Sequence, residues 1–385
     1  MTPSYPALEA LRARASIKWR WYPEDVIPCW IADMDFDIAP PIRVAMDALL
    51  ARGELGYPQG YAQSGLDEVF CQRVATRFDW RVAPGQVQFF SDVVQAIYLA
   101  LLTLSEPGDG ILFQTPIYPP FFSAVAETGR RADTCPLRWT SEGYRIDFDA
   151  LSRSIDARTR ILLLCHPHNP SGRAFTRAEL EGLAELVLRH DLTVISDEIH
   201  ADLMLAPRPH IPFASIDPEI AARTLTLTSP SKPFNLAGLC LAVGVFGSTR
   251  LAKAFSALPD HVRGGRSALG MAAARAAWTE GDAWLDGTLA LLRQNRDRIA
   301  HTVTTRWPEV RHVAPEATYL AWLDFRACGL PVEPHTFFLE QARVGLSEGP
   351  AFGAEGRGWV RLNFATSPEV LDTILSRMDA ALAAR

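Results

Sequence analysis

Lys232 is the residue of this 385-residue chain whose type and position most favour covalent chemistry. It lies among serine, proline and apolar residues, shortly after the run 224–228 that predicts a strand. A lysine withdrawn from water has a lowered pKa, and its neutral amine can form a Schiff base with a carbonyl compound. A lysine exposed to solvent in a loop is the alternative interpretation of the same position.

Three more polar segments follow apolar runs in the same way. Asp197 ends one run, and its carboxylate could keep a heterocyclic nitrogen protonated, although a helix N-cap or a surface acidic pair is the plainer interpretation. Asn169, in the segment 166–172, can donate and accept hydrogen bonds to a ligand oxygen. Asp92 and Val93 begin a helix whose free N–H groups suit a phosphate, unless Asp92 only caps that helix.

Several classes of ligand and partner are not expected. His166 and His168 suggest a metal, but no third histidine, cysteine or carboxylate stands at ligand spacing, so we predict no metal site. The six cysteines lie far apart without a C-x-x-C pair, which indicates reduced thiols in a cytoplasmic protein. The net charge of −6 offers no basic field for nucleic acid, and no apolar stretch approaches the length of a membrane span.

The elements that must position the polar segments alternate between strands and helices. Helices are predicted at 93–104 and at 176–190, where Thr176 and Glu179 form a capping box. Strands are predicted at 87–90, 111–113, 161–165, 194–196, 224–228 and 241–246. Continuous apolar runs separated by helices predict a mostly parallel α/β sheet that is buried on both faces. Ligands of such sheets bind beyond the carboxyl ends of the strands, where the four polar segments lie.

The region after residue 266 differs in character. It predicts a helix-rich stretch, two strands and a last helix, at 267–306, 318–325, 359–364 and 369–384. No repeat and no flexible linker separates it from the rest, so we expect tightly docked domains. Three parts are predicted: an N-terminal arm that packs on the small domain near the site, a large α/β domain and a small α+β domain, at 1–44, 45–265 and 266–385.

In this order and at these distances, the polar segments resemble the signature of the fold-type I pyridoxal-phosphate enzymes, the aspartate aminotransferase superfamily. The signature residues are Asn169-Pro170-Ser171-Gly172, Asp197-Glu198, Ser229 with Lys232, and Arg361-Leu362-Asn363. More narrowly, the chain is similar to the cystathionine β-lyases and related C–S lyases of the maltose-regulator-like and patB-like branch. The residues that carry this resemblance are Lys18-Trp19, 28–36, Gly56-Tyr57, 115–121 and Asp197-Glu198-Ile199-His200.

The resemblance implies an aspartate aminotransferase-like fold, with a mostly parallel seven-stranded sheet in the large domain, and pyridoxal 5′-phosphate as cofactor. Lys232 would form the Schiff base with the cofactor and later move the Cα proton of the substrate. Asp197 would hold the pyridine nitrogen protonated, and Tyr118 would stack on the ring. Asn169 would contact the phenolic oxygen, and His200 is placed at the cofactor by the same motif.

The resemblance also implies how the phosphate is held. Ser229, the backbone amides around Asp92 and Val93, and Tyr57 from a neighbouring subunit would bind it, which implies a homodimer with shared active sites. Many relatives have Gly-Val-Val where this chain has Asp92-Val93-Val94. A carboxylate that pointed at the phosphate would repel it. We therefore predict that Asp92 caps the helix beginning at Val93 and faces away from the phosphate.

For the substrate, the resemblance implies that Arg361, with Asn169 and Trp30, binds an amino acid through its α-carboxylate. The predicted reaction is the α,β-elimination of cystathionine or a related cysteine S-conjugate to a thiol, pyruvate and ammonia. An aminotransferase of the same fold is the alternative, because fold does not decide between the two. Members of this branch can also act as regulatory proteins that bind a transcription factor, and no sequence feature marks a surface for such a partner.

Overall fold

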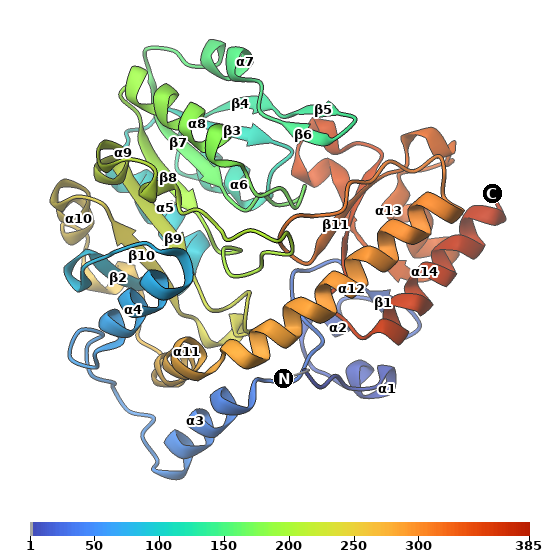
Figure 1. Cartoon of the computed structure of the whole chain (residues 1–385), viewed down its shortest axis with the longest axis horizontal. Coiled ribbons are helices and arrows are strands. Elements are labelled where there is room, and N and C mark those ends of the chain that lie inside the picture. The colour runs from blue at the N-terminus through green and yellow to red at the C-terminus, as the bar shows by residue number, and fades with distance from the viewer. Residues whose placement is uncertain (1–2) are drawn as a thin grey trace.

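A seven-stranded sheet lies at the centre of the larger of two lobes (Figure 1). The computed structural model describes residues 3–385. In chain order the strands of this sheet are Val87–Phe90 (β2), Gly110–Thr115 (β3), Arg131–Pro136 (β4), Thr159–Cys165 (β7), Thr193–Asp197 (β8), Thr224–Thr228 (β9) and Ala242–Phe246 (β10). Their spatial order is β2-β10-β9-β8-β7-β3-β4. Strand β10 runs antiparallel to both neighbours and the other pairs are parallel, which confirms the predicted fold class.

Strand β4 is the one member of the sheet that the sequence analysis did not predict. It lies at an edge of the sheet, and most of its side chains are exposed or only partly buried. The continuous apolar runs that identified the inner strands are therefore missing from it. A two-stranded hairpin, Arg138–Thr140 (β5) with Gly143–Arg145 (β6), follows directly.

Helices cover both faces of the sheet. One apolar core joins the sheet to helices Val93–Leu104 (α5), Pro120–Glu127 (α6) and Thr249–Ser256 (α10). Another core joins the opposite face to Phe148–Arg153 (α7), Arg177–Arg189 (α8) and Pro218–Arg223 (α9). Helix α8 begins at the predicted capping box, in which Thr176 Oγ1 accepts from the Glu179 N–H at 3.2 Å and Glu179 Oε2 accepts from the Thr176 N–H at 2.8 Å. These layers fix the strand ends that carry the predicted site residues.

The smaller lobe contains an antiparallel sheet and long helices. The sheet consists of Leu320–Asp324 (β11), Trp359–Asn363 (β14) and Ser347–Glu348 (β13), in that spatial order. Its helices are Asp282–Arg306 (α12), Pro334–Phe337 (α13) and Pro368–Ala383 (α14). The helix-rich stretch predicted at 267–306 is two helices, because Ala268–Glu280 (α11) ends at Gly281. A Cβ there would lie 2.6 Å from the Phe234 ring, so the packing requires glycine.

The N-terminal arm packs on the smaller lobe. It contains the short helices Leu8–Arg12 (α1) and Ile17–Arg20 (α2) and the strand Ile27–Pro28 (β1), which pairs in parallel with Val344–Gly345 (β12). Helix α3 follows at Pro40–Ala51 and packs against α11, so the predicted boundary after residue 44 falls inside a helix. Helix α4 spans Leu66–Phe78.

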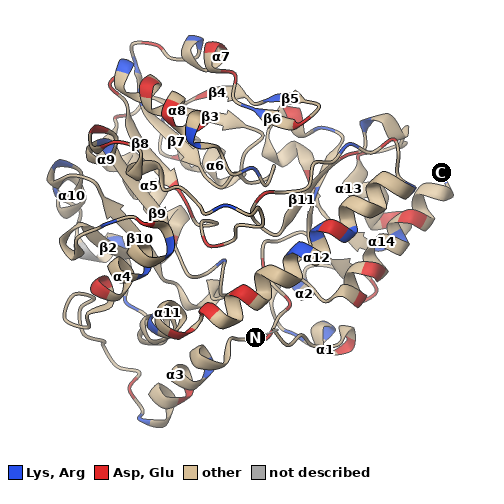
Figure 2. Ribbon diagram, viewed as in Figure 1, with Lys and Arg blue, Asp and Glu red and all other residues tan. Residues whose placement is uncertain are grey.

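Charge is dispersed over the molecule. Figure 2 shows acidic and basic residues interspersed along both lobes, as on α12. Within residues 3–385, no helix combines the length and the apolar character that a membrane crossing needs.

Candidate active site

One cavity, with a volume of about 220 Å³, opens at the carboxyl ends of the parallel strands and reaches to the smaller lobe. Its lining contains every predicted site residue except Tyr57 and Trp30. The predicted residues that line it are Asp92, Val93, Tyr118, Asn169, Asp197, His200, Ser229, Lys232 and Arg361. The fold thus brings together predicted site residues that are up to 269 positions apart in the sequence, the separation of Asp92 and Arg361.

Lys232 is not an exposed loop lysine. It follows β9, and its Nζ donates a hydrogen bond to the Ala32 carbonyl at 2.9 Å. Burial lowers the pKa of Lys232, and the nearby guanidinium of Arg361 lowers it further, whereas the carboxylate of Asp33 opposes both effects. The lowered pKa favours the neutral amine, which is the form that attacks a carbonyl carbon or accepts a proton.

Asp197 ends β8 in the floor of the cavity and is buried. Its Oδ1 accepts a hydrogen bond from the Ile199 N–H at 3.1 Å. Burial raises the pKa of Asp197 to about 7, and the charge of Glu198 adds to this effect. No cation of the described residues forms an ion pair with it, so the carboxylate can accept a proton-bearing nitrogen of a ligand.

Arg361 reaches the cavity from β14 of the smaller lobe and is 5% exposed. Its Nη1 donates to Asn169 Oδ1 and its Nη2 to the Trp30 carbonyl, each at 2.9 Å. The buried Nε has no hydrogen-bond partner in the described chain. Burial lowers the pKa of Arg361 to about 10. A buried guanidinium that meets only neutral oxygen atoms is suited to an incoming carboxylate.

The phosphate end of the predicted site lies at the start of α5. Asp92 Oδ1 accepts from the Gln95 N–H at 2.8 Å, which confirms that Asp92 caps the helix beginning at Val93. The amides of Val93 and Val94, in the first turn of α5, have no partner inside the helix and belong to residues that line the cavity. Ser229 Oγ donates to the Leu241 carbonyl at 2.7 Å, so this hydroxyl already has a partner within the protein.

Of the remaining predicted residues, Tyr118 and His200 line the cavity, whereas Trp30 and Tyr57 do not. Burial raises the pKa of Tyr118 and lowers that of His200 to about 3, so both side chains are neutral at pH 7. Trp30 contributes its carbonyl, which accepts from Arg361, whereas its indole packs against Trp21 with ring centroids 5.4 Å apart. Tyr57 is fully exposed and does not line the cavity of its own chain.

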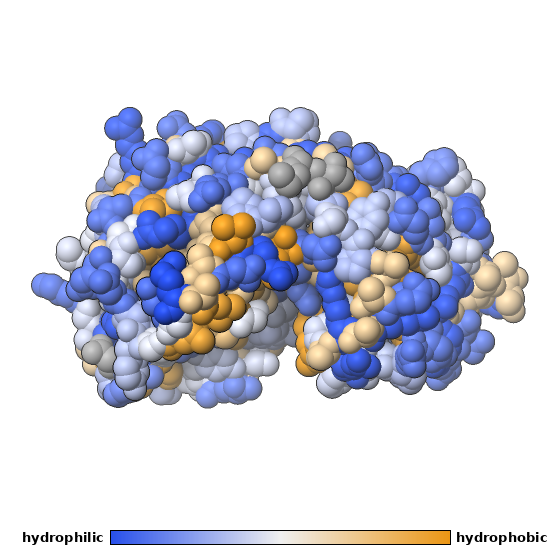
Figure 3. Space-filling view, turned by 90° about the horizontal axis from the view of Figure 1, so that it is seen from below, coloured by the Kyte–Doolittle hydropathy of each residue, from blue (hydrophilic) through white to orange (hydrophobic). Residues whose placement is uncertain are grey.

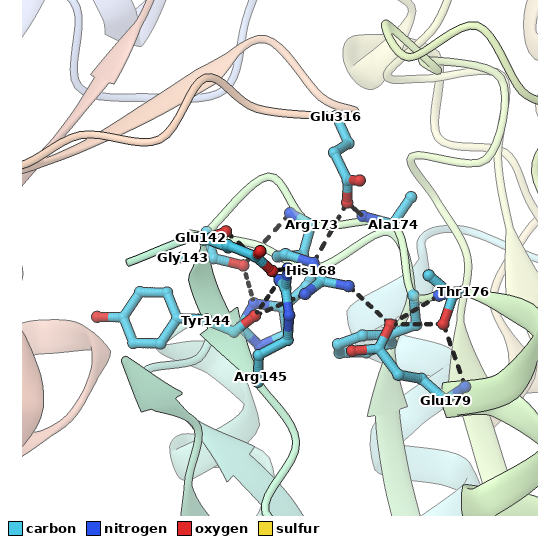
Figure 4. Close-up of polar contacts among 12 residues, drawn as sticks. Glu142, Gly143, Tyr144, Arg145, His168, Arg173, Ala174, Thr176, Glu179 and Glu316 are labelled. Atoms are coloured by element: carbon cyan, nitrogen blue, oxygen red, sulfur yellow. Dashed lines mark hydrogen bonds and ion pairs between the residues drawn. The ribbon is translucent and has the colours of Figure 1, made fainter. Parts of the chain in front are cut away.

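A network that the sequence analysis missed supports the loop of Asn169 (Figure 4). Arg173 donates to the Tyr144 carbonyl at 2.6 Å and to Glu179 at 2.7 Å, and its Nε lies 3.2 Å from Glu316 of the following lobe. The N–H of His168 donates to the Arg173 carbonyl at 2.7 Å. Because the partners come from β6, α8 and the segment before β11, Arg173 fixes this loop against three elements. No short sequence pattern marks such a dispersed contact.

The chain belongs to the aminotransferase class I and II family, whose model matches residues 30–378. Among curated relatives, it is 36% identical to the cystathionine beta-lyase PatB of Bacillus subtilis, over 95% of this chain and 96% of the relative. It is 33% identical to the cystathionine beta-lyase of Corynebacterium glutamicum, over 98% of this chain and 100% of the relative.

Solved structures are similar along the whole chain. Cystalysin from Treponema denticola, whose crystal structure contains pyridoxal 5′-phosphate, superposes with a TM-score of 0.95 at 30% identity and covers 100% of both chains. The structure of OvoB superposes with a TM-score of 0.93 at 38% identity, over 100% of this chain and 99% of the other. The C–S lyase from Staphylococcus hominis gives a TM-score of 0.91 at 28% identity, over 97% of each chain.

Proposed function

We propose that this protein is a pyridoxal-phosphate-dependent carbon–sulfur β-lyase that acts on cystathionine or related cysteine S-conjugates. The observation that carries the proposal is the convergence of Lys232, Asp197 and Arg361 on one cavity. They supply an amine with a lowered pKa, a buried carboxylate without a cation and a guanidinium without an anion. The relatives named cystathionine beta-lyase and the solved C–S lyase agree with the cofactor and the reaction expected from the sequence.

The groups that the cavity leaves unpaired match the chemical groups of the cofactor. Asp197 would hold the protonated pyridine nitrogen, which would supply the cation that this buried carboxylate lacks. The amides of Val93 and Val94 would bind the phosphate at the positive end of α5. Tyr118 and Asn169 line the cavity between these two ends and would contact the ring. When bound, the cofactor supplies an electron sink for the electron pair that is left on the substrate Cα.

The residues of the chain then bind and orient the substrate. The Nε–H of Arg361, which has no partner in the described chain, would donate to the α-carboxylate of the substrate. Asn169 and the Trp30 carbonyl keep the guanidinium in position. Lys232, as a neutral amine, would remove the proton from Cα. The bonding pair of the Cβ–S bond leaves with sulfur as thiolate, which takes up a proton, and hydrolysis of the remaining fragment gives pyruvate and ammonia.

We infer that the protein works as a homodimer in which Tyr57 contributes to the partner's phosphate site. Tyr57 is fully exposed, and apolar residues of α3 and the loop that follows it are exposed with it: Val44, Leu50 and Leu55. Figure 3 views the molecule from this side and shows hydrophobic residues gathered beside an indentation of the surface. A monomer in solution with a functional phosphate site would contradict this inference.

Product analysis tests the proposed reaction against the aminotransferase alternative. Elimination restores the starting enzyme in each cycle, so thiol, pyruvate and ammonia should form continuously and in equal amounts without an added keto acid. A transaminase would stop after one equivalent until an acceptor arrived. Arg361 is the one arginine among the described residues that line the cavity, so a single chain offers no second guanidinium for a dicarboxylic side chain. Amino-group exchange with 2-oxoglutarate and no multiple turnover would favour the alternative.

A further inference from the structure

Lys18 is a buried lysine in a chain that otherwise uses arginine. Of the 38 lysine and arginine residues, only Lys18, Lys232 and Lys253 are lysine. Lys253 is exposed, whereas Lys18 is 2% exposed. A buried cation must be compensated by partners in the protein. The partners of Lys18 therefore indicate what this residue does.

Lys18 pairs with a carboxylate that is equally buried. Its Nζ lies 2.9 Å from Asp35 Oδ1 and donates to the Asp33 carbonyl at 3.0 Å. The indole N–H of Trp19 donates to the same Asp35 oxygen at 2.9 Å. The Asp35 N–H donates to the Ala365 carbonyl at 2.9 Å, which ties the pair to the smaller lobe. Lys18 thus anchors the chain at Asp33 and at Asp35, on either side of Met34.

The segment beside this pair, residues 30–34, crosses the cavity, and we call it the strap. Each of its carbonyls accepts a hydrogen bond. The carbonyls of Trp30, Ala32 and Asp33 accept from three cations, which are Arg361, Lys232 and Lys18 respectively. The strap therefore holds both cations of the cavity through its main chain, and Lys18 holds the strap.

We propose that the buried Lys18–Asp35 ion pair is a positioning element for Lys232: it fixes the strap so that the Ala32 carbonyl accepts from the free amine of Lys232 and the charge of the Asp33 carboxylate stays near that amine. This inference rests on the proposed role of Lys232. It assigns a task to a motif, Lys18-Trp19 and Asp35, that lies outside the cavity lining. The pair does not touch the reacting atoms, so it acts only through the strap.

The charges around Lys232 explain why the position of the strap matters. Asp33 raises the pKa of Lys232, and burial and Arg361 lower it. Asp197 also faces the amine and raises its pKa, while His200 beside it is neutral at pH 7. A carbonyl held at 2.9 Å binds the ammonium form better than the neutral amine. Displacing the strap would remove this preference and lower the pKa of Lys232.

The test replaces the pair as a unit with apolar residues, Lys18→Met with Asp35→Leu. The net charge of the site stays the same, so a change at Lys232 reports position rather than charge. Such replacements of a buried ion pair are often neutral or stabilising, so the variant is expected to fold. Lys18→Met with Asp35→Asn, which also removes both charges and preserves the shape of the Asp35 side chain, provides the second variant if the first does not fold.

Because the chain contains three lysines, the titration of Lys232 can be followed separately from that of the others. In the full chain without cofactor, lysine labelled with ¹³C at Cε gives three side-chain signals, which Lys253→Met and Lys232→Ala assign. We expect the titration midpoint of the Lys232 signal to move to lower pH by about one pH unit in the double variant. In the cofactor-loaded protein, the pH at which the visible band changes should move in the same direction.

Two controls separate positioning from general loosening. Arg130→Met removes another buried cation, whose partners are Ser105 and Thr128, outside the cavity lining. It should lower the melting temperature without moving the Lys232 midpoint. Asp33→Asn removes the carboxylate that raises the pKa of Lys232 most and should lower the midpoint more than the double variant does. A folded double variant with an unchanged Lys232 midpoint would overturn the proposal, whereas loss of lyase activity alone would concern the proposed function.

Discussion

Arg173 and Arg361 are equally buried, at 5% exposure each, but their partners differ in kind. Arg173 meets two carboxylates, those of Glu179 and Glu316. Arg361 forms no ion pair with any described residue and donates to an amide oxygen, a carbonyl and a hydroxyl. A buried cation without an anion is unfavourable unless a ligand supplies one. The paired arginine supports the fold, and the unpaired one lies where we propose that an anionic group of the substrate binds.

Lys18 and Lys232 repeat the same contrast between a paired and an unpaired cation. Lys18 is paired with Asp35 at 2.9 Å, whereas Lys232 donates to a carbonyl at the same distance. The two paired cations lie outside the cavity lining, whereas the two without a counterion line the cavity. Among these four residues, the missing counterion distinguishes the candidate site residues from those that support the fold; Arg130 is also buried without a carboxylate partner among the described residues, but it donates to Ser105 and Thr128 outside the cavity.

The largest effect is expected from Lys232→Ala. The variant should lose both the visible absorption of the covalently bound cofactor and all measurable turnover, because no other lysine reaches the cavity lining. Lys253→Ala is the matched control, since that lysine is exposed on α10, and it should keep the yellow colour. Borohydride reduction followed by peptide mapping checks the attachment point, and a label on Lys253 would show the assignment to be wrong.

Asp197→Asn should keep the fold and much of the cofactor but lose turnover by a factor on the order of 10² or more. A neutral amide cannot hold the pyridine nitrogen protonated. Asp324→Asn provides the contrast, because that buried carboxylate is paired with Arg326 at 2.7 and 2.8 Å. We expect the second variant to lower stability and leave kcat nearly unchanged. Steady-state kinetics would remove Asp197 from the mechanism if its variant turned over normally.

Buried histidines predict how stability depends on pH. Burial lowers the pKa of His168 and His200 to about 3 and that of His312 to about 4. Below about pH 6.5 the unfolded chain takes up protons at these residues while the folded chain does not, so the free energy of unfolding falls as the pH falls from 6.5 towards 4. His312→Gln should flatten this dependence by about one proton. Urea unfolding at several pH values measures the slope, and an unchanged slope would contradict the prediction.

Asp197 opposes this trend in the cofactor-free protein. Its pKa is raised to about 7 by burial, so the folded chain keeps a proton that the unfolded chain loses near pH 4. Its contribution to stability therefore declines as the pH rises from about 4 to 7. In the same unfolding series, Asp197→Asn should make the rise of stability with pH steeper. A shallower rise in this variant would contradict the assigned direction.

The smallest effect is expected from Asp92→Gly. The variant loses the side-chain helix cap, and because glycine is itself tolerated at this position the cost in unfolding free energy is about a few tenths of a kcal/mol. It also loses a negative charge near the predicted phosphate site, so cofactor affinity should stay the same or improve slightly. Cofactor titration monitored by absorbance gives the dissociation constant. A large loss of affinity would show that the carboxylate takes part in binding.

Sequence reasoning predicted the inner strands and the site residues because both leave local signals. The strands β7 to β10 are runs rich in apolar and β-branched residues; Asp197 is the last residue of β8, and Asn169 and Lys232 come four residues after the ends of β7 and β9. Edge strand β4 left no such signal because much of it is exposed. The motif resemblance added Arg361, whose strand belongs to the other lobe and which residue patterns alone would not place in the cavity.

What the sequence could not provide is the pairing of charges. Arg173 and Glu316 are 143 positions apart by their numbers, and nothing in either segment indicates that they meet. Trp30 was predicted as a substrate-binding residue, but whether its indole or its main chain faces the site depends on the path of the strap. Such contacts depend on tertiary packing, which a local pattern does not encode.

The contrast between the paired and the unpaired arginine is tested most directly by comparing Arg361→Met with Arg173→Met. Steady-state kinetics gives KM for each variant, and urea unfolding gives the free energy of unfolding. Arg361→Met should raise the KM for a cysteine S-conjugate roughly 10- to 100-fold while leaving the unfolding free energy almost unchanged. Arg173→Met should lower the unfolding free energy by about 2 kcal/mol, less than for a fully buried pair because Glu316 is 34% exposed, and should raise KM less than Arg361→Met does, since it reaches the site only through the loop of Asn169. If Arg361→Met instead lost stability with a normal KM, the cavity would not be the substrate site that this account assigns.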